Sequence, residues 1–412
     1  MNNPVEEPLP NAGVSRTFQA LIHPTYRRLW VAGWLWYSNL WIEFIVLPWL
    51  MLDLTNSPMQ VALVGVTRMA PMFFFGVLGG SLSDRFPKHH VLFTLQCFNI
   101  LVTLTMTLIL ISGIIRPWHI FLVAFLMGTS WTIDFSARRS YFAEMLPPNR
   151  LTNAISLDAA AMTGSGILGS ILGGTLITLT GYHGAYIFML ILFLIGFTLL
   201  FPVPSRQTSA PRPALANPLT QIAEAFQLIR TNRAVWAAFS VTVAMNFFGF
   251  PYFQMVPVIA RDVLDVNAFL FSILSAAAGT GSFIGSMVIA TRGSRRQGSL
   301  YSVGSIIMLV SVFAFAFSNL YGLSVLLLFI AGLGMAGFAT MQPVLMLQAT
   351  PPELSGRAMG IIAIGIGASP LGMFVVGLLA EFFGAPTAIA ISTGVGIIVL
   401  FGLRIQLEQL RD

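Results

Sequence analysis

The chain has 412 residues, of which 56% are hydrophobic and 9% are charged, and its mean hydropathy is +0.82. A soluble domain carries about 25% charged residues, so these charges could not cover the surface of a water-soluble protein of this length. The composition excludes a water-soluble enzyme and a disordered chain. It indicates an all-α membrane protein that crosses the bilayer many times.

Cysteine and histidine usage argues against a resident metal or cofactor. Cys97 is the single cysteine, which excludes a disulfide framework and a cysteine-ligated zinc site. The histidines fall near expected helix ends, so no buried imidazole cluster is expected to bind a metal. The sequence has no nucleotide-binding loop of the G-x-x-x-x-G-K-[ST] kind, and therefore ATP is not the expected energy source. We expect no metal, no cofactor and no enzymatic activity.

Basic residues exceed acidic residues by a formal net charge of +6, and they recur in ones to threes between long apolar runs. This spacing is typical of loops at a membrane surface and disfavours nucleic acid as a partner. The first seventeen residues lack a basic segment followed by an apolar one, so no cleavable signal peptide is expected. The expected surroundings are a lipid bilayer.

Twelve apolar runs are long enough to cross the membrane, which takes about 20 residues each. They run continuously without period-two alternation, so they are expected to be helices rather than barrel strands. The expected helices cover residues 29–52, 60–82, 89–113, 117–139, 151–180, 184–203, 234–260, 266–290, 298–318, 321–348, 356–382 and 385–405.

The distribution of basic residues predicts the orientation. Twelve crossings put both termini on one side of the membrane. Of the 21 basic residues, Arg68 lies within an expected helix and only Arg116 and Arg261 fall in loops on the side opposite the termini. Basic loops stay in the cytoplasm. We therefore expect both termini to be cytoplasmic. We also expect the protein to be a monomer in a bacterial cytoplasmic (inner) membrane.

A proline- and serine-rich segment, 204–233, separates six expected helices from six others. Small-residue positions repeat between these halves: Gly169, Gly174 and Gly181 each have a glycine 203 residues later. Parallel six-helix repeats are the architecture of many secondary transporters. The expected units are a tail (1–28), a six-helix bundle (29–203), a cytoplasmic linker (204–233), a second six-helix bundle (234–405) and a tail (406–412).

The loop between the second and third expected helices, residues 79–90, reads GGSLSDRFPKHH. It resembles the signature loop G-x-L-[AS]-D-R-x-x-[KR]-[KR] of the major facilitator superfamily. The resemblance implies a cytoplasmic latch in which Asp84 faces the N-terminal end of helix eleven and Arg85 or Lys88 reaches Asp134. The alternative is a basic loop with a chance aspartate. The expected latch residues are Gly80, Asp84, Arg85, Lys88, Asp134 and Arg138.

Three further stretches, 47–58, 134–139 and 146–154, are similar to the branch that contains macrolide efflux pumps and the enterobactin exporter. That similarity implies export of a small organic molecule in exchange for protons. Helix five also resembles the antiporter motif G-x-x-x-G-P-x-x-G-G, with serines at the first glycine and at the proline. Its packing residues are Ser165, Gly169, Ser170, Gly173 and Gly174, and helix eleven contributes Pro370.

Ionisable side chains within the expected helices are candidates for proton coupling, because each is costly in lipid and needs a partner. Glu43 and Arg68 lie at the same depth, roughly 12–15 Å below the outer surface, so we expect them to pair. Glu43 then either takes up a proton or forms a permanent structural pair. Asp158 either titrates or bonds a neighbouring helix. Asp134 lies near the surface, where the latch role is favoured.

The superfamily resemblance implies a substrate cavity lined by helices one, four, seven and ten. On helix one, Trp36, Asn39 and Glu43 share the face expected to point inward, and Trp34, Tyr37 and Trp41 lie on the opposite stripe, expected to face lipid or pack. Pro251 and Pro257 are expected to bend helix seven. The other expected cavity residues are Thr129, Trp131, Asn246, Phe250, Phe253, Gln254, Phe338, Met341, Gln342 and Gln348.

The aromatic, methionine and amide side chains in this set suit a bulky, mostly apolar small-molecule substrate. The function we expect is proton-coupled export of amphipathic, drug- or siderophore-like molecules. A lipid or lysolipid transporter and a proton-driven importer remain alternatives. A receptor-like sensor is disfavoured because the chain has no soluble domain to pass on a signal.

Overall fold

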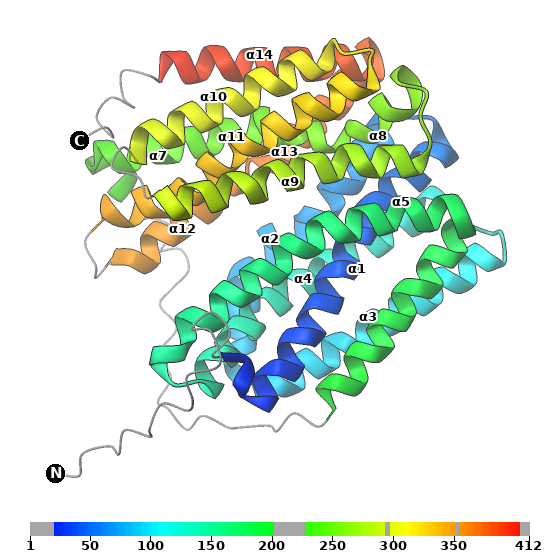
Figure 1. Cartoon of the computed structure of the whole chain (residues 1–412), viewed down its shortest axis with the longest axis vertical. Coiled ribbons are helices and arrows are strands. Elements are labelled where there is room, and N and C mark those ends of the chain that lie inside the picture. The colour runs from blue at the N-terminus through cyan, green and yellow to red at the C-terminus, as the bar shows by residue number, and fades with distance from the viewer. Residues whose placement is uncertain (1–19, 202–226, 293–296, 351–353, 404–412) are drawn as a thin grey trace.

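The protein is seen in a computed structural model that describes residues 20–201, 227–292, 297–350 and 354–403 (Figure 1). Within these ranges, the side chains at 73–85, 143, 148, 149, 152, 292 and 355–358 are not described. The linker and both tails expected from the sequence lie largely outside the described residues. We call the side where α1 begins and α14 ends the linker side, and the opposite side the far side.

The first half is built from long helices, several of which begin at a proline that supplies no N–H to the first helical turn. The helices are α1 (Pro24–Thr55), α2 (Pro58–Arg85), α3 (Lys88–Ile111), α4 (Pro117–Met145) and α5 (Pro148–Leu200). Gly181, inside α5, has a φ of +72°, a conformation that glycine adopts readily. The chain reverses there, so α5 contains two membrane crossings.

The second half contains the same number of crossings with more interruptions. Its seventh crossing joins α7 (Arg233–Ala244), the π-helix η2 (Met245–Gly249), the 3-10 helix η3 (Phe250–Gln254), α8 (Val256–Val258) and the π-helix η4 (Ile259–Val263). The irregular stretch includes Pro251 and Pro257, the two positions where bends are expected, because proline removes a helical hydrogen bond. The remaining helices are α9 (Ala268–Arg292), α10 (Gln297–Ala316), α11 (Tyr321–Gln348), α12 (Ser355–Ile366), α13 (Ser369–Phe383) and α14 (Ala385–Gly402).

The membrane crossings agree with the expected helices. Ten described helices are long and apolar enough to span a bilayer, and one of them, 153–200, includes the reversal at Gly181. α2 supplies the remaining crossing, and the twelve-helix fold is confirmed. The structure differs from the expected continuous helix 356–382, because α12 and α13 are separate helices. Pro370 stands in the first turn of α13, where it lacks the N–H needed to continue α12.

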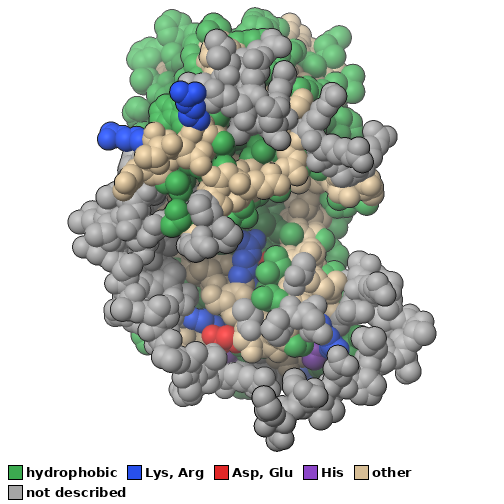
Figure 2. Space-filling view, turned by 90° about the vertical axis from the view of Figure 1, so that its left-hand side faces the viewer, with side chains coloured by type: hydrophobic (Ala, Val, Ile, Leu, Met, Phe, Trp, Pro, Cys, Tyr) green, Lys and Arg blue, Asp and Glu red, His purple; other side chains and the backbone are tan. Residues whose placement is uncertain are grey.

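The helices form two six-helix bundles that meet chiefly where α5 packs on α9 and α2 packs on α13 (Figure 1). The bundles approach each other at the far side and diverge toward the linker side. Figure 2 looks onto the linker side and shows the surface hollowed between the bundles, with acidic and basic side chains within the hollow. A cleft therefore separates the two halves and opens on the linker side.

The repeated glycines occupy equivalent places in the two halves. A Cβ on Gly169 would meet Ser38 and Trp41 of α1, and a Cβ on Gly372 would meet Phe247 of the seventh crossing. These two glycines therefore let the fifth crossing approach the first, and the eleventh approach the seventh. The sequence repeat thus corresponds to a repeat in packing.

The next glycine pair lies between the halves rather than within them. A Cβ on Gly174 would meet Ala268 and Ser272 of α9, and a Cβ on Gly377 would meet Met59 and Ala62 of α2. Gly384, 203 residues after Gly181, also has a positive φ, +82°, and ends the eleventh crossing as Gly181 ends the fifth. The interface between the halves therefore has the same small-residue contact on each side.

We expect Gly174→Ala to destabilise the protein by about 1–3 kcal/mol, because the added methyl group meets the backbone of α9 and forces the halves apart. Gly164→Ala is the matched control on the same helix, since nothing lies within 4 Å of its Cβ position. Thermal unfolding of the purified variants measures the difference. Equal stability of the two variants would contradict the close approach.

Candidate functional site

A buried ion pair joins the first two helices. Arg68 Nη1 of α2 donates to Glu43 Oε2 of α1 at 2.6 Å, and the two side chains are 3% and 2% exposed. The Arg68 guanidinium also lies 4.4 Å from the centre of the Phe44 ring. A Cβ on Gly128 of α4 would collide with the Arg68 carbonyl of α2. The glycine therefore lets α2 and α4 approach closely. The expected Glu43–Arg68 contact is present.

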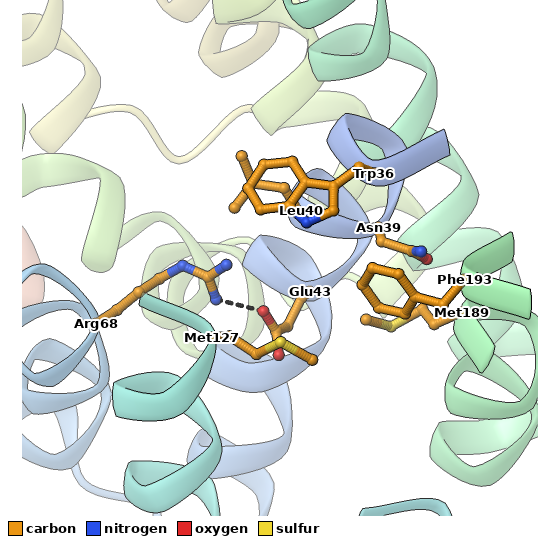
Figure 3. A pocket seen from close by; sticks show the side chains of 8 residues that line it. All are labelled: Trp36, Asn39, Leu40, Glu43, Arg68, Met127, Met189 and Phe193. Carbon is orange, nitrogen blue, oxygen red and sulfur yellow. Dashed lines mark hydrogen bonds and ion pairs between the residues drawn. The ribbon is translucent and has the colours of Figure 1, made fainter. Parts of the chain in front are cut away.

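A small pocket surrounds this ion pair (Figure 3). The predicted residues Trp36, Asn39 and Glu43 line it together with Leu40 of the same helix. The opposite walls are Arg68, Met127, Met189 and Phe193, from the second, fourth and sixth crossings. Its free volume of about 10 Å³ has room for about one water molecule. The pocket is therefore too small for an organic substrate.

This location differs from the expected one between the halves. All lining residues of the pocket belong to the first six-helix bundle. The physical reason is that Glu43 requires a cation, and the cation at its depth is Arg68, on a helix of the same bundle. The polar face of helix one therefore turns into its own bundle rather than toward the second half.

A second group of buried charges lies nearer the linker side, between α1, α4 and α5. Arg138 donates to both oxygens of Asp134, from Nε at 2.9 Å and from Nη2 at 2.8 Å. Its Nη1 donates to the Leu29 carbonyl of α1 at 3.2 Å. The Tyr37 hydroxyl lies 3.0 Å from both carboxylate oxygens of Asp158. All four of these ionisable side chains are buried.

The two groups differ in their charge balance. Glu43 and Arg68 are one anion and one cation in direct contact. Asp134 and Asp158 are two carboxylates beside one buried guanidinium, that of Arg138, which is bidentate to Asp134. The next cation, Arg139, is partly exposed and stacks at 3.7 Å over the ring of Phe135. Tyr37 can supply Asp158 with a single hydrogen bond, so Asp158 is the carboxylate whose charge is least compensated.

Its position on the helical wheel placed Tyr37 on the stripe expected either to face lipid or to pack against other helices. The side chain is buried, so it packs. Its role as the partner of Asp158 was missed. The available signal was chemical, because a buried tyrosine hydroxyl needs a hydrogen-bond partner and Asp158 was expected to need one on a neighbouring helix.

The residues of the expected latch are only partly described. The side chains of Gly80, Asp84 and Arg85 lie outside the described residues. Lys88 is buried at the first turn of α3. Asp134, the expected partner of Arg85 or Lys88, accepts from Arg138 one turn along its own helix. This i,i+4 spacing favours such a pair.

The second half gathers several predicted cavity residues around Thr242. Its hydroxyl accepts from Gln342 Nε2 at 3.0 Å and lies 3.1 Å from the Tyr301 hydroxyl, and its carbonyl accepts from Asn246 at 2.9 Å. The Phe338 ring stacks on Tyr301 with centroids 5.3 Å apart, and meets Phe250 edge-on at 5.5 Å. Neither Thr242 nor Tyr301 was predicted. Tyr301 lies on α10, the ninth crossing, which was not expected to contribute, and Thr242 lies on α7 of the expected seventh crossing.

The other predicted cavity residues are dispersed. Gln254 crosses from the second half to lie over Gly65 of α2, and Met341 is buried. Phe253 stacks on Tyr252 at 4.4 Å, and Gln348 is exposed. On α4, the Thr129 hydroxyl bonds its own helix at the Phe125 carbonyl, and Trp131 is partly buried.

The serines of the helix-packing motif donate to backbone oxygens. Ser165 lies 3.4 Å from the Ser38 hydroxyl and donates to the Trp34 carbonyl at 3.3 Å. Ser170 donates to Gly166 within its own helix at 2.7 Å. Gly173 faces Ile42 and Ile45 of α1. The motif therefore joins the first and fifth crossings.

The sequence profile of the transmembrane secretion effector family matches residues 15–412. The chain belongs to this family of the major facilitator superfamily. Its relatives are transporters rather than enzymes, and it is a multi-pass membrane transporter of a small molecule.

Two curated relatives match most of this transporter. The staphyloferrin A transporter of Staphylococcus aureus (strain NCTC 8325 / PS 47) is 22% identical over 84% of this chain and 86% of its own length. The uncharacterized MFS-type transporter YfiS of Bacillus subtilis (strain 168) is 22% identical over 89% of this chain and 90% of its own length.

Solved structures share the fold at low sequence identity. One is a bacterial homolog of the human lysosomal transporter Spinster in an inward-facing, unoccupied conformation, with a TM-score of 0.75, 14% identity and coverage of 95% of this chain and 99% of that one. Another is a POT family transporter in complex with 5-aminolevulinic acid, with a TM-score of 0.76, 10% identity and coverage of 94% and 96%.

We expect Glu43→Gln to lower the free energy of unfolding by about 3–5 kcal/mol, because it leaves the Arg68 guanidinium buried without its anion. Combining it with Arg68→Met should recover much of that loss. Denaturant or thermal unfolding of the purified transporter measures both. If the double variant lost as much stability as the two single variants together, the two side chains would not be a coupled pair.

Proposed function

We propose that this transporter exports amphipathic, drug- or siderophore-like small molecules in exchange for protons, by alternating access of the cleft between its halves. The observation that carries the proposal is the buried carboxylate of Asp158, which among the described side chains bonds the Tyr37 hydroxyl and no cation. Export is supported by membership of a secretion family, and a siderophore-like substrate by the similarity to the staphyloferrin A transporter.

Asp158 is the proposed proton-binding group. Among the described buried side chains of this cluster, Arg138 is committed to Asp134, and Asp134, Asp158 and Arg138 together carry one more negative than positive charge when both carboxylates are ionised. Uptake of one proton at Asp158 makes the cluster neutral, which is the lower-energy state in a buried site. Glu43 has Arg68 beside it and is already neutralised, so we assign the Glu43–Arg68 pair a structural role.

The proposed substrate-facing groups of the second half are uncharged. Asn246, Gln342 and Thr242 offer amide and hydroxyl groups, and Phe250 and Phe338 offer aromatic surface. These chemistries suit a bulky molecule with a few hydrogen-bonding groups. In this proposal the first half binds the proton and the second half contacts the substrate.

We also propose that the protein is a monomer in a bacterial cytoplasmic membrane with its linker side inside the cell. The basic residues of the loops support this orientation. The latch remains part of the proposal, with Asp84 as its central residue. In this orientation the cleft is open to the cytoplasm, as an exporter requires when it loads substrate.

The test uses liposomes that contain the purified transporter and an internal pH dye, challenged with macrolides, catecholate siderophores and lysolipids. We expect a soluble substrate to drive proton movement with the wild-type protein. Asp158→Asn should reduce this movement at least about tenfold while substrate still exchanges down its own gradient. Ser170→Ala is the control, since its hydroxyl bonds only within α5.

Two outcomes would contradict the proposal. Wild-type proton movement in Asp158→Asn would remove Asp158 from the coupling mechanism. Lysolipid transport that persists when the proton gradient is collapsed, with no response to the soluble compounds, would favour the lipid-transporter alternative.

A further inference from the structure

Two charged residues of the second half hold the connection between α1 and α2 on the far side. Arg261, in η4 at the end of the seventh crossing, donates from Nη1 to the Leu52 carbonyl at 2.9 Å and lies 3.6 Å from Asp53 Oδ1. Glu381, near the end of α13, accepts from the Ser57 hydroxyl at 2.8 Å. It also accepts from the Met59 backbone N–H at 3.1 Å. None of these contacts was predicted.

The signs of these charges match the helix ends that they touch. α1 ends at Thr55, and its last carbonyl oxygens carry partial negative charge, which favours the guanidinium of Arg261. α2 begins at Pro58, and its first N–H groups carry partial positive charge, which favours the carboxylate of Glu381. Arg261 and Glu381 therefore contact the two ends of one helix–helix connection of the first half. Arg261 also donates from Nε to Asp262 Oδ1 of its own segment at 2.7 Å, and keeps Nη1 for the Leu52 carbonyl.

Beneath these polar contacts lies an apolar seal between the same halves. The Trp49 ring of α1 stacks on Phe271 of α9 with centroids 5.2 Å apart and an interplanar angle of 18°. Gly377 of α13 allows Ala62 and Met59 of α2 to approach closely. Opening of the far side would have to separate the aromatic stack and both charged contacts together.

We propose that Arg261 and Glu381 form a far-side clamp that holds the transporter in its linker-side-open state and that must release for the far side to open. They are positioning residues, since they act on the ends of α1 and α2 and not on substrate. The inference rests on the alternating access of the proposed function, but on neither its substrate nor its coupling ion.

The clamp is suited to a reversible gate because its contacts are near the surface. Arg261 is 24% exposed and Asp53 is 41% exposed, so water screens their attraction. Each contact between a charge and a helix end shifts the equilibrium between the closed and the open far side by about two- to fivefold. Together the two contacts bias the closed state by roughly tenfold, which binding of substrate or a proton can overcome.

Cysteine accessibility tests the clamp. Ser272, fully buried beside Gly174 at the far-side interface, becomes the reporter as Ser272→Cys in a Cys97→Ser background. The protein is placed in lipid nanodiscs, where a soluble maleimide reaches both membrane faces. We expect Arg261→Gln and Glu381→Gln each to accelerate labelling about two- to fivefold, and the double variant about tenfold.

Matched variants separate a gate from a general loosening of the fold. Arg116→Gln removes the same charge from an exposed far-side arginine just before α4 and should leave labelling unchanged. Arg261→Lys keeps the cation and should restore most of the slow labelling. Thermal unfolding of each variant reports stability independently of accessibility.

The proposal is overturned if Arg261→Gln and Glu381→Gln label at the rate of Arg116→Gln, or if Arg261→Lys labels as fast as Arg261→Gln. Because the assay uses neither substrate nor a proton gradient, its result is independent of the transport test. A failure of proton-coupled export would therefore leave the clamp standing, and a failure of the clamp would leave the exporter standing.

Discussion

The cost of placing charge away from water governs this structure. In the described part of the chain, every buried Asp, Glu, Lys and Arg side chain belongs to the first half: Glu43, Arg68, Lys88, Asp134, Arg138 and Asp158. Each charge needs a partner or a proton, because burial without either costs several kcal/mol. The pairing of Glu43 with Arg68 fixes how α1, α2 and α4 pack. The second group leaves one carboxylate without a cation of its own, and a mobile proton is the natural partner for it.

The two halves share a duplicated architecture, although the buried charges lie in the first half. Gly169 and Gly372 serve the same contact within their bundles, and Gly174 and Gly377 serve the same contact between them. The halves therefore share their packing but differ in chemistry. One carries the buried charges, and the other presents neutral amides and aromatic rings near an irregular seventh crossing. A rocking motion about the shared contacts would couple the protonation of one half to the exposure of the other.

Much of the fold could be predicted from the sequence, because hydrophobic length alone identifies membrane crossings and proline positions mark their bends. The Glu43–Arg68 contact could also be predicted, since equal depth on adjacent helices is a one-dimensional property. The direction in which Glu43 faces could not, because it depends on which bundle supplies the cation. Tyr37 and Tyr301 were missed for the related reason that their partners lie on helices distant in sequence. Arg261 and Glu381 were missed because their contacts exist only between the halves.

The central claim is that Asp158 takes up the proton, and infrared difference spectroscopy of the purified transporter tests it most directly. Exchange between acidic and alkaline buffer should reveal the carbonyl band of a protonated, buried carboxyl group. The account predicts that this band is lost in Asp158→Asn and retained in the Glu43→Gln, Arg68→Met double variant. A band that persists in Asp158→Asn and disappears in the double variant would contradict the account and make Glu43 the proton-binding group.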